Sequence, residues 1–296
     1  MATGLDWVIL RPSVVVGRAA YGGSALFRGL AALPVVPHIG SAGKLQIVQL
    51  DDVVETVIYF LRPDAPVRVA LDIAGREPID FNDVVAAYRR WFGWRPAQQV
   101  RPPRLLMDIM YRLGDLAGWL GWRPPIRTTA RKEILRGAVG DPGPWTVMTG
   151  IVPRSLEQSL VANPANVQER WFAKLYLLKP VMFALLSLFW IVTGVISLGP
   201  GWHIGVALMR EGGVTGLAAT AAVAAGALAD VCIGTGIAFR RTARAALYAA
   251  VVLSLVYAVL GTVLVPRLWI DPLGPMLKIW PIVVLHLVAL AILEDR

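Results

Sequence analysis

Apolar side chains fill four long runs in the C-terminal part of the chain. The runs are Leu177–Leu198, Val214–Phe239, Ala245–Val265 and Leu277–Leu293. Each is close to the ~20 residues that a helix needs to cross a hydrocarbon core about 30 Å thick. The acidic or basic groups inside them are Lys179, Asp230, Lys278 and His286. The pattern predicts an all-α, four-helix transmembrane bundle over residues 176–296.

In residues 1–162, short apolar runs alternate with segments whose apolar residues have helical spacing. We expect strands at Leu5–Leu10, Leu45–Leu50 and Val67–Ile73, and helices at Ser24–Leu33, Val53–Leu61 and Phe81–Phe92. Asp51, Asp52 and Asp80 should cap helix N-termini, where a carboxylate accepts from free N–H groups. A further helix should start at Ser155. Strands alternating with helices predict a soluble α/β domain over 1–162, joined to the bundle by a linker at 163–175.

A further segment, Leu105–Leu120, is strongly amphipathic, with its apolar side chains on one helical face. Trp119, Trp122 and several basic residues follow it, from Arg123 to Arg136. Two interpretations stay open. The face packs on the soluble core, or the helix lies on the inner leaflet with tryptophans at headgroup depth and arginines on lipid phosphate.

The placement of basic residues predicts the membrane topology. Arg240, Arg241 and Arg244 lie between the second and third apolar runs, and Arg170 and Lys174 precede the first. Clusters of this kind stay on the cytoplasmic side of a membrane. We therefore expect four crossings, with the N- and C-termini both cytoplasmic.

The net charge of +9 raises the question of nucleic-acid binding. Much of the excess is arginine beside the predicted spans, where anionic lipid supplies the partner, and no nucleic-acid-binding motif is present. We predict a lipid bilayer as partner and no nucleic acid. The single cysteine, Cys232, excludes an intrachain disulfide and a cysteine-rich metal site.

Several segments, in their order, resemble a known family. Three segments resemble the C-terminal half of an extended or atypical short-chain dehydrogenase/reductase: GLDWVILRPSVVVG, LQIVQLDDVVETV and VALDIAGREPIDFNDVVAAY. The tail that joins such domains to a DoxX-like membrane domain resembles GIVPRSLEQSL and ERWFAKLY, and DPLGPMLKIWP is typical of that membrane domain. The resemblance implies a partial Rossmann-like fold that binds NAD(P), with its N-terminal nucleotide-binding half missing.

The resemblance also implies site residues. Pro12, Ser13 and Val14 would lie near the nicotinamide and substrate, and Asp52 matches an acidic position at a strand–helix junction. The glycine fingerprint that receives the pyrophosphate and the catalytic Tyr-x-x-x-Lys do not occur in the 296 residues. We therefore assign no catalytic residue, and cofactor binding stays open. One hypothesis is that Met1 is an internal start.

Ionisable groups inside a bilayer are costly and are functional candidates by default. Asp230 lies ten residues before Arg240, and His286 eight residues before Glu294. At 1.5 Å per residue the two side chains have similar depths, about 15 and 12 Å. We predict an intramembrane polar pair, Asp230–His286. Its alternative roles are a proton or quinone path and a structural hydrogen bond.

Two kinds of function remain. The first is a membrane-anchored, NAD(P)-dependent oxidoreductase-like protein of the short-chain dehydrogenase/reductase type, not catalytically complete in this chain. The alternative is a DoxX-like integral membrane protein without enzymatic activity, whose soluble part is a degenerate interaction domain. A variant of the alternative is a redox subunit that uses the bundle itself, with a quinone or another redox partner.

Overall fold

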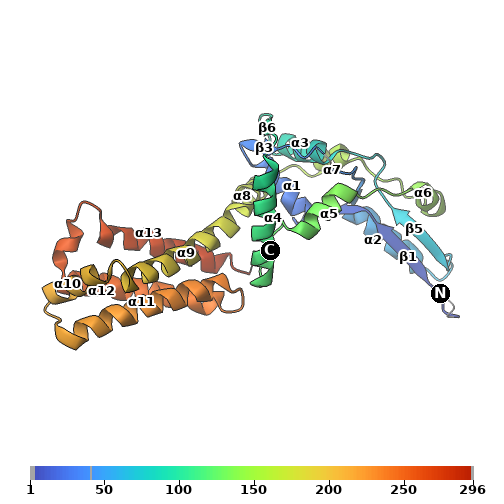
Figure 1. The fold of residues 1–296 in the computed structure, drawn as a ribbon. Coiled ribbons are helices and arrows are strands. Elements are labelled where there is room, and N and C mark those ends of the chain that lie inside the picture. Colours follow the sequence, from blue (N-terminus) through green and yellow to red (C-terminus); the bar gives the residue numbers. More distant parts are fainter. Residues whose placement is uncertain (1–3, 41, 295–296) are drawn as a thin grey trace. The chain divides into compact units, whose positions relative to one another are not determined.

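The structure is a computed structural model that describes residues 4–40 and 42–294 (Figure 1). Met1, considered above as an internal start, lies outside the described residues. The chain forms two compact units. The N-terminal unit comprises the residues up to Leu116 together with Pro124–Leu177, and the bundle unit comprises Ala117–Arg123 and the residues from Leu178 onward.

The strands of the N-terminal unit are short and form parallel pairs. β1 (Val8–Pro12) pairs with β5 (Val69–Ile73), β2 (Val14–Val16) with β4 (Ile47–Gln49), and β3 (Val35–Pro37) with β6 (Gln98–Val100). Parallel neighbours need a crossover, and helices supply it here between β2 and β4 and between β1 and β5. The unit is therefore an α/β arrangement of small parallel strand pairs. It does not by itself establish a Rossmann fold.

Eight helices in the described residues start within this unit. They are α1 (Gly23–Ala31), α2 (Leu50–Phe60), α3 (Phe81–Trp91), α4 (Arg104–Trp119), α5 (Thr128–Arg136), α6 (Gly143–Thr149), α7 (Leu156–Ala162) and α8 (Val167–Tyr176). The core lies between α1 and α3, where the ring of Phe27 packs 5.2 Å from that of Phe81 and 6.2 Å from that of Tyr88. The segment expected as a linker contains α8, which packs on α1.

Close packing between α1 and α8 depends on a glycine. A Cβ built at Gly29 would lie 2.4 Å from Cδ1 of Tyr176. The same burial raises the pKa of the Tyr176 phenol to about 12, because the charged form loses its water. Residues 167–176 are thus part of the folded N-terminal unit.

Two of the expected helix caps are wrong in their chemistry. α2 begins at Leu50, and its N-cap residue, Gln49, makes no side-chain cap bond. Asp80 is the N-cap residue of α3, but its carboxylate pairs with Lys44 at 2.7 Å and makes no cap bond. At both N-termini a cation competes with the backbone N–H groups for the carboxylate. Lys44 pairs with Asp80, and Arg154 pairs with Asp52. A helix, α7, starts directly after Ser155, close to where it was expected, and Ser155 forms a capping box with Gln158 there.

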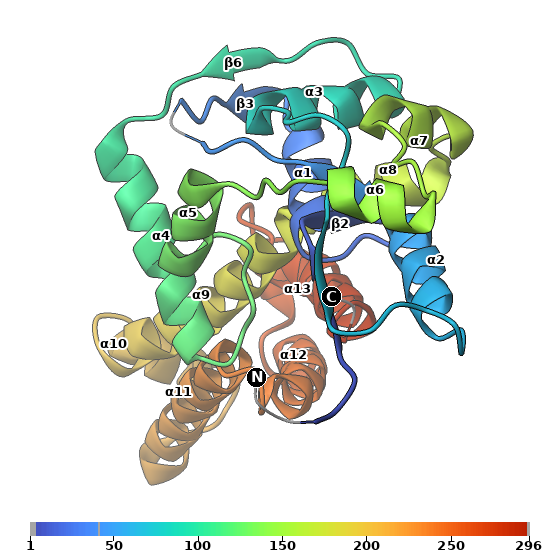
Figure 2. The same ribbon diagram turned by 90° about the vertical axis from the view of Figure 1, so that its right-hand side faces the viewer.

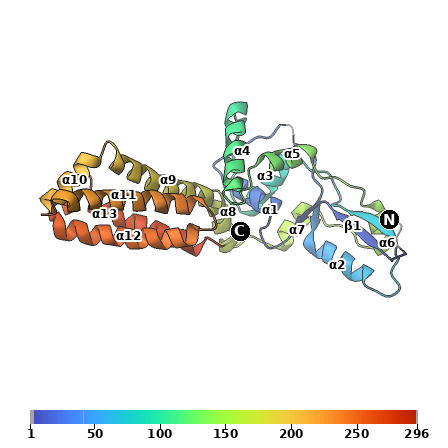
Figure 3. The same ribbon diagram turned by 60° about the horizontal axis from the view of Figure 1, so that its bottom comes forward.

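The bundle unit is all helical. Its elements are α9 (Leu178–Leu198), α10 (Trp202–Glu211), α11 (Gly216–Ala238), α12 (Ala243–Leu264), the 3₁₀ turn η1 (Pro266–Trp269) and α13 (Pro275–Ala291). Among the described residues, α9, α11 and α12 are long and apolar enough to cross a membrane. α13 is apolar but has 17 residues. The four longer helices run alongside one another (Figures 1 and 3).

Small residues let α9 and α11 approach closely. A Cβ at Gly194 of α9 would lie 2.5 Å from the carbonyl oxygen of Ala227, and one at Gly234 of α11 would lie 2.7 Å from that of Ser187. The Ser187 hydroxyl donates to the carbonyl oxygen of Gly234 at 2.8 Å. Gly234 is thus a point of close contact between the two helices.

Polar contacts tie helix ends together. Lys179 at the start of α9 donates to the carbonyl oxygen of Ile292, and Nη2 of Arg240 donates to that of Leu293 at 3.0 Å. Arg244 also pairs with Glu294. We call this the basic end of the bundle: it joins the start of α9, the α11–α12 connection and the residues after α13.

A second contact joins two interhelical connections at the end of the bundle opposite the basic end. Glu211, the last residue of α10, accepts from Arg267 of η1, with Nη2 2.7 Å from Oε2. This hydrogen bond and the guanidinium charge lower the pKa of Glu211. The α9–α11 connection is thereby joined to the α12–α13 connection.

Candidate functional site

The segment Pro12–Val14 lies where one strand changes partner. Pro12 is opposite Ile73, so it stands at the carboxyl ends of β1 and β5, whereas Val14 is opposite Ile47, the first residue of β4. Between them, Ser13 donates its backbone N–H to Ile73 at 3.0 Å and its hydroxyl to the carbonyl oxygen of Gln46 at 2.7 Å. Pro12 is exposed, and Ser13 and Val14 are half-buried.

Ligands of open α/β sheets bind beyond the carboxyl ends of strands, at points where the strand order changes. The place of Pro12–Val14 is compatible with such a role. The hydroxyl of Ser13 already donates to the chain itself, so what remains to face a ligand is the exposed ring of Pro12 and the backbone beside it.

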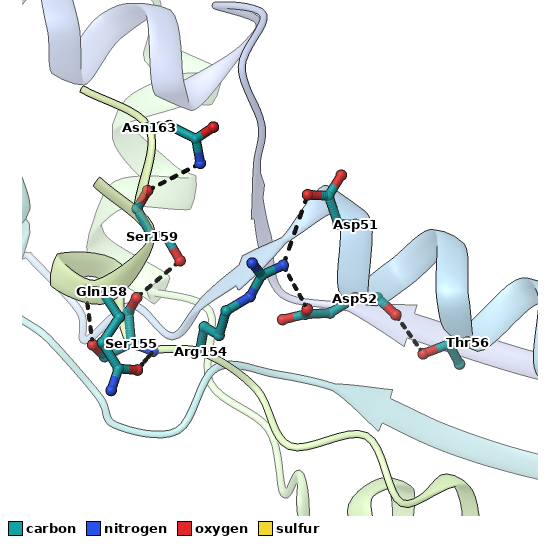
Figure 4. Close-up of polar contacts among 8 residues, drawn as sticks. All are labelled: Asp51, Asp52, Thr56, Arg154, Ser155, Gln158, Ser159 and Asn163. Atoms are coloured by element: carbon teal, nitrogen blue, oxygen red, sulfur yellow. Dashed lines mark hydrogen bonds and ion pairs between the residues drawn. The ribbon is translucent and has the colours of Figure 1, made fainter. Parts of the chain in front are cut away.

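Asp52 anchors a polar cluster at the start of α2 (Figure 4). Its side chain is 6% exposed, and Nη2 of Arg154 lies 3.2 Å from Oδ1. The same nitrogen is 3.7 Å from Oδ2 of Asp51, so Arg154 points between the two carboxylates. The carbonyl oxygen of Asp52 accepts from the Thr56 hydroxyl at 2.7 Å, and that hydroxyl accepts from Nε1 of Trp145 at 2.9 Å.

This cluster connects α2 to α6 and to the segment before α7. Beyond Arg154, the Ser155 hydroxyl accepts from the backbone N–H of Gln158 at 3.2 Å and fixes the start of α7. Within residues 4–40 and 42–294, Oδ2 of Asp52 and Nε2 of Gln49 are buried without a hydrogen-bond partner. The arrangement holds elements together and adds negative charge at the N-terminus of α2.

That negative charge bears on an NAD(P) cofactor. A helix N-terminus after a parallel strand is where a pyrophosphate binds, through free N–H groups and the positive end of the helix dipole. α2 directly follows β4, but its first turn carries Asp51 and Asp52. These residues repel a phosphate. The acidic first turn of α2 therefore does not favour a phosphate group at this helix N-terminus.

The structure does not bring Asp230 and His286 together. Asp230, buried on α11, accepts on Oδ1 from the Tyr257 hydroxyl of α12 at 2.9 Å. His286, fully buried on α13, accepts on Nε2 from Nε1 of Trp190 of α9 at 2.8 Å. Its Nδ1 lies 2.6 Å from the carbonyl oxygen of Ile282. In the described part of the chain the expected pair is thus replaced by two separate pairs.

The bonding partners fix the tautomer of His286. An indole N–H only donates, so Nε2 is the acceptor and the proton resides on Nδ1, which donates to the carbonyl of Ile282. Both ring nitrogens are engaged, which leaves none for a carboxylate. The predicted pair rested on the similar depth of the two residues, and depth does not determine which face of its helix a residue occupies.

Three partners in these networks were not foreseen: Arg154, Tyr257 and Trp190. Tryptophan is common in the aromatic belts at membrane boundaries. Trp190, by contrast, is 2% exposed and lies inside the bundle. A signal for Tyr257 was present in the sequence, because a phenol within an apolar run needs a hydrogen-bond partner when buried.

Comparison with known proteins identifies the class of the membrane part. Residues 187–287 match the profile of the DoxX-like family. Together with the three apolar helices, this match shows an integral membrane protein. Its membrane domain is DoxX-like.

Two other comparisons add little. No curated protein matches the chain. A solved structure titled "Crystal structure of gox2253" is 20% identical, with a TM-score of 0.34 over 52% of this chain and 46% of its own. This chain therefore spans less than half the length of that structure, and a likeness of this size supports no conclusion on fold or function.

Proposed function

We propose that the chain is a membrane-anchored, oxidoreductase-like protein of the short-chain dehydrogenase/reductase type. In this proposal the DoxX-like bundle holds the α/β unit at the bilayer. The observation that supports it is the place of Pro12–Val14 at the carboxyl ends of the parallel strands β1 and β5. At this point the chain stops pairing with β5 and begins to pair with β4. The proposed cofactor is NAD(P), with the nicotinamide beside Pro12.

In the same proposal, the chain binds NAD(P) only weakly. The acidic first turn of α2 opposes a pyrophosphate, and the glycine fingerprint does not occur in these residues. The competing function is that of a DoxX-like integral membrane protein whose α/β unit binds another protein. The ion pairs that fix α2 and α7 serve such an interaction domain equally well.

A cofactor titration separates the two functions. Detergent-purified full chain is titrated with NADH and with NADPH, and nicotinamide fluorescence is recorded. We expect a weak but saturable enhancement. Pro12→Glu should abolish it by placing a negative charge beside the cofactor, whereas Pro63→Glu, at another exposed proline, should not. If the unmodified chain shows no saturable enhancement, the cofactor proposal is lost and the interaction domain remains.

We further propose four crossings with both termini in the cytoplasm. Two observations support it. The start of α9, the α11–α12 connection and the residues after α13 share polar contacts at the basic end, which an even number of crossings requires. That end also carries Arg240, Arg241 and Arg244, in keeping with the positive-inside rule.

A further inference from the structure

The described residues of the chain leave the apolar face of α4 exposed. This face consists of Leu105, Leu106, Ile109, Met110, Leu113 and Leu116, whose exposed fractions run from 38% to 72%. In α4, all of which the structure describes, only Tyr111 and Gly114 are buried. An amphipathic helix of a soluble domain normally buries its apolar stripe. Here the opposite side of the helix is the one that packs.

The packed side is polar and is fixed to α5 and the segment before it, and α4 and α5 lie side by side (Figure 2). Asp108 pairs with Arg131 at 2.6 Å, and Asp115 lies 3.7 Å from Nε of Arg127. Gly114 lets the chain pass close, because a Cβ there would meet the carbonyl oxygen of Ile126 at 1.6 Å. The helix therefore cannot rotate about its axis to bury the apolar face without breaking these contacts.

The charges around the face have one sign. The two carboxylates of α4 are paired with arginines of the neighbouring segment. Arg101, Arg104, Arg112 and Arg123 are exposed, and within the described ranges none of them has a carboxylate partner. Unpaired guanidinium groups beside an exposed leucine-rich stripe are complementary to an anionic lipid surface.

The C-terminal end of α4 is continuous with the membrane domain. Ala117–Arg123 belongs to the bundle unit. The carbonyl oxygen of Leu120 accepts from the backbone N–H of Arg240 at 3.0 Å, and Nε1 of Trp122 donates to the carbonyl oxygen of Ala238 at 2.7 Å. The Trp122 ring lies 4.7 Å from that of Phe183 and is covered by the Arg240 guanidinium, 5.5 Å from its centroid.

These contacts fix the depth at which α4 ends. In the proposed topology Arg240, at the basic end of the bundle, marks the level where hydrocarbon gives way to headgroups. The ring of Trp119, 75% exposed, lies 6.2 Å from that of Phe239, and Trp122 lies against Arg240, so both tryptophans are near a level that this residue type favours. A helix of 16 residues that leaves this level with an exposed apolar face has a bilayer surface within reach.

We propose that α4 is an in-plane helix of the membrane interface. Its apolar face inserts into the headgroup–acyl boundary of the leaflet at the basic end of the bundle. Arg101, Arg104, Arg112 and Arg123 bind the phosphates of anionic lipids. The occupant of the face is lipid and not a second copy of the chain.

Site-specific fluorescence in a bilayer tests the proposal. The full chain carries Cys232→Ala and one new cysteine, either Ile109→Cys or Leu113→Cys, labelled with an environment-sensitive dye. Val161→Cys is the matched control, since Val161 is 80% exposed on α7 of the same unit. Each protein is placed in nanodiscs of phosphatidylcholine with or without phosphatidylserine, and gel filtration checks its fold.

We expect blue-shifted emission at positions 109 and 113, with strong quenching by lipid-attached nitroxide and weak quenching by iodide. The control should show the reverse. Phosphatidylserine should increase the nitroxide quenching several-fold, and Arg104→Glu with Arg112→Glu should remove that increase. Iodide quenching equal to that of the control overturns the proposal. Blue-shifted emission without nitroxide quenching also overturns it, because protein then covers the face.

Discussion

At the scale of single residues, the largest effects should come from buried polar groups that have one partner. Arg154→Gln leaves the Asp52 carboxylate, 6% exposed, without its cation. Arg154 itself is 44% exposed, so solvent screens part of the interaction. We expect a loss of about 1–2 kcal/mol in the stability of the N-terminal unit. Thermal unfolding of the detergent-purified chain measures it as a fall of several degrees.

The matched control for Arg154 is another arginine ion pair of the same unit. Arg90 pairs with Glu157 at 2.8 Å, but both side chains are more than half exposed. Exposed pairs contribute about 0–1 kcal/mol, so Arg90→Gln should leave the unfolding temperature nearly unchanged. Equal shifts for the two variants would contradict a special role for Asp52.

Inside the bundle, Trp190 is expected to matter through one hydrogen bond. Trp190→Phe keeps an aromatic ring but removes the donor to Nε2 of His286, which then stays buried without a partner. The cost of such an unsatisfied group is about 1–3 kcal/mol. Trp280→Phe is the control, because Trp280 is 48% exposed on α13. Scanning fluorimetry in detergent should show a clear shift for the first variant and little for the second.

The candidate site residues illustrate what sequence reasoning can reach. That Asp230 and His286 would be buried and bonded follows from the cost of ionisable groups in a bilayer. Their partners do not follow from it. The rotation of each helix about its axis decides them, and it is set by contacts such as that of Gly234 with the backbone of Ser187. For Pro12–Val14, the role beside a cofactor remains a prediction.

At the scale of elements, the α9–α11 contact is the most sensitive to volume. Gly234→Leu would place side-chain atoms where the backbone of α9 lies, with Ile191 N and Ser187 O both 2.7 Å from the Cβ position. The helices must separate, and the hydrogen bond from Ser187 must break. We expect loss of the monodisperse peak in gel filtration. Ala221→Leu adds the same side chain at an exposed position of α11 and should be tolerated.

Elements with a strong period were predicted, and those held by backbone contacts alone were not. α4 and the long apolar helices follow from their spacing of apolar residues. β6, with the sequence Gln-Gln-Val and all residues exposed, has no pattern that marks a strand. It exists because β3 offers a parallel backbone partner. α10, a ten-residue helix between two apolar runs, was likewise not foreseen.

At the scale of the whole molecule, the number of crossings depends on whether α13 crosses the bilayer. Its 17 residues span about 25 Å at 1.5 Å per residue, less than a hydrocarbon core of about 30 Å. Local thinning of the bilayer and extension of the Lys278 side chain toward the headgroups can compensate for the difference. The contacts of Ile292 and Leu293 with the basic end support a full crossing.

Cysteine labelling on intact cells tests the proposed four crossings. In a Cys232→Ala background, single cysteines replace Val161, Arg241, Leu273 or Glu294, all of which are exposed. A membrane-impermeant maleimide should label only Leu273→Cys in intact cells, because it alone lies outside, and should label the other three after lysis. If Glu294→Cys is labelled without lysis while Arg241→Cys is not, α13 does not cross. The residues after α13 could then not reach Lys179, Arg240 and Arg244 in the membrane, and the even number of crossings would be lost.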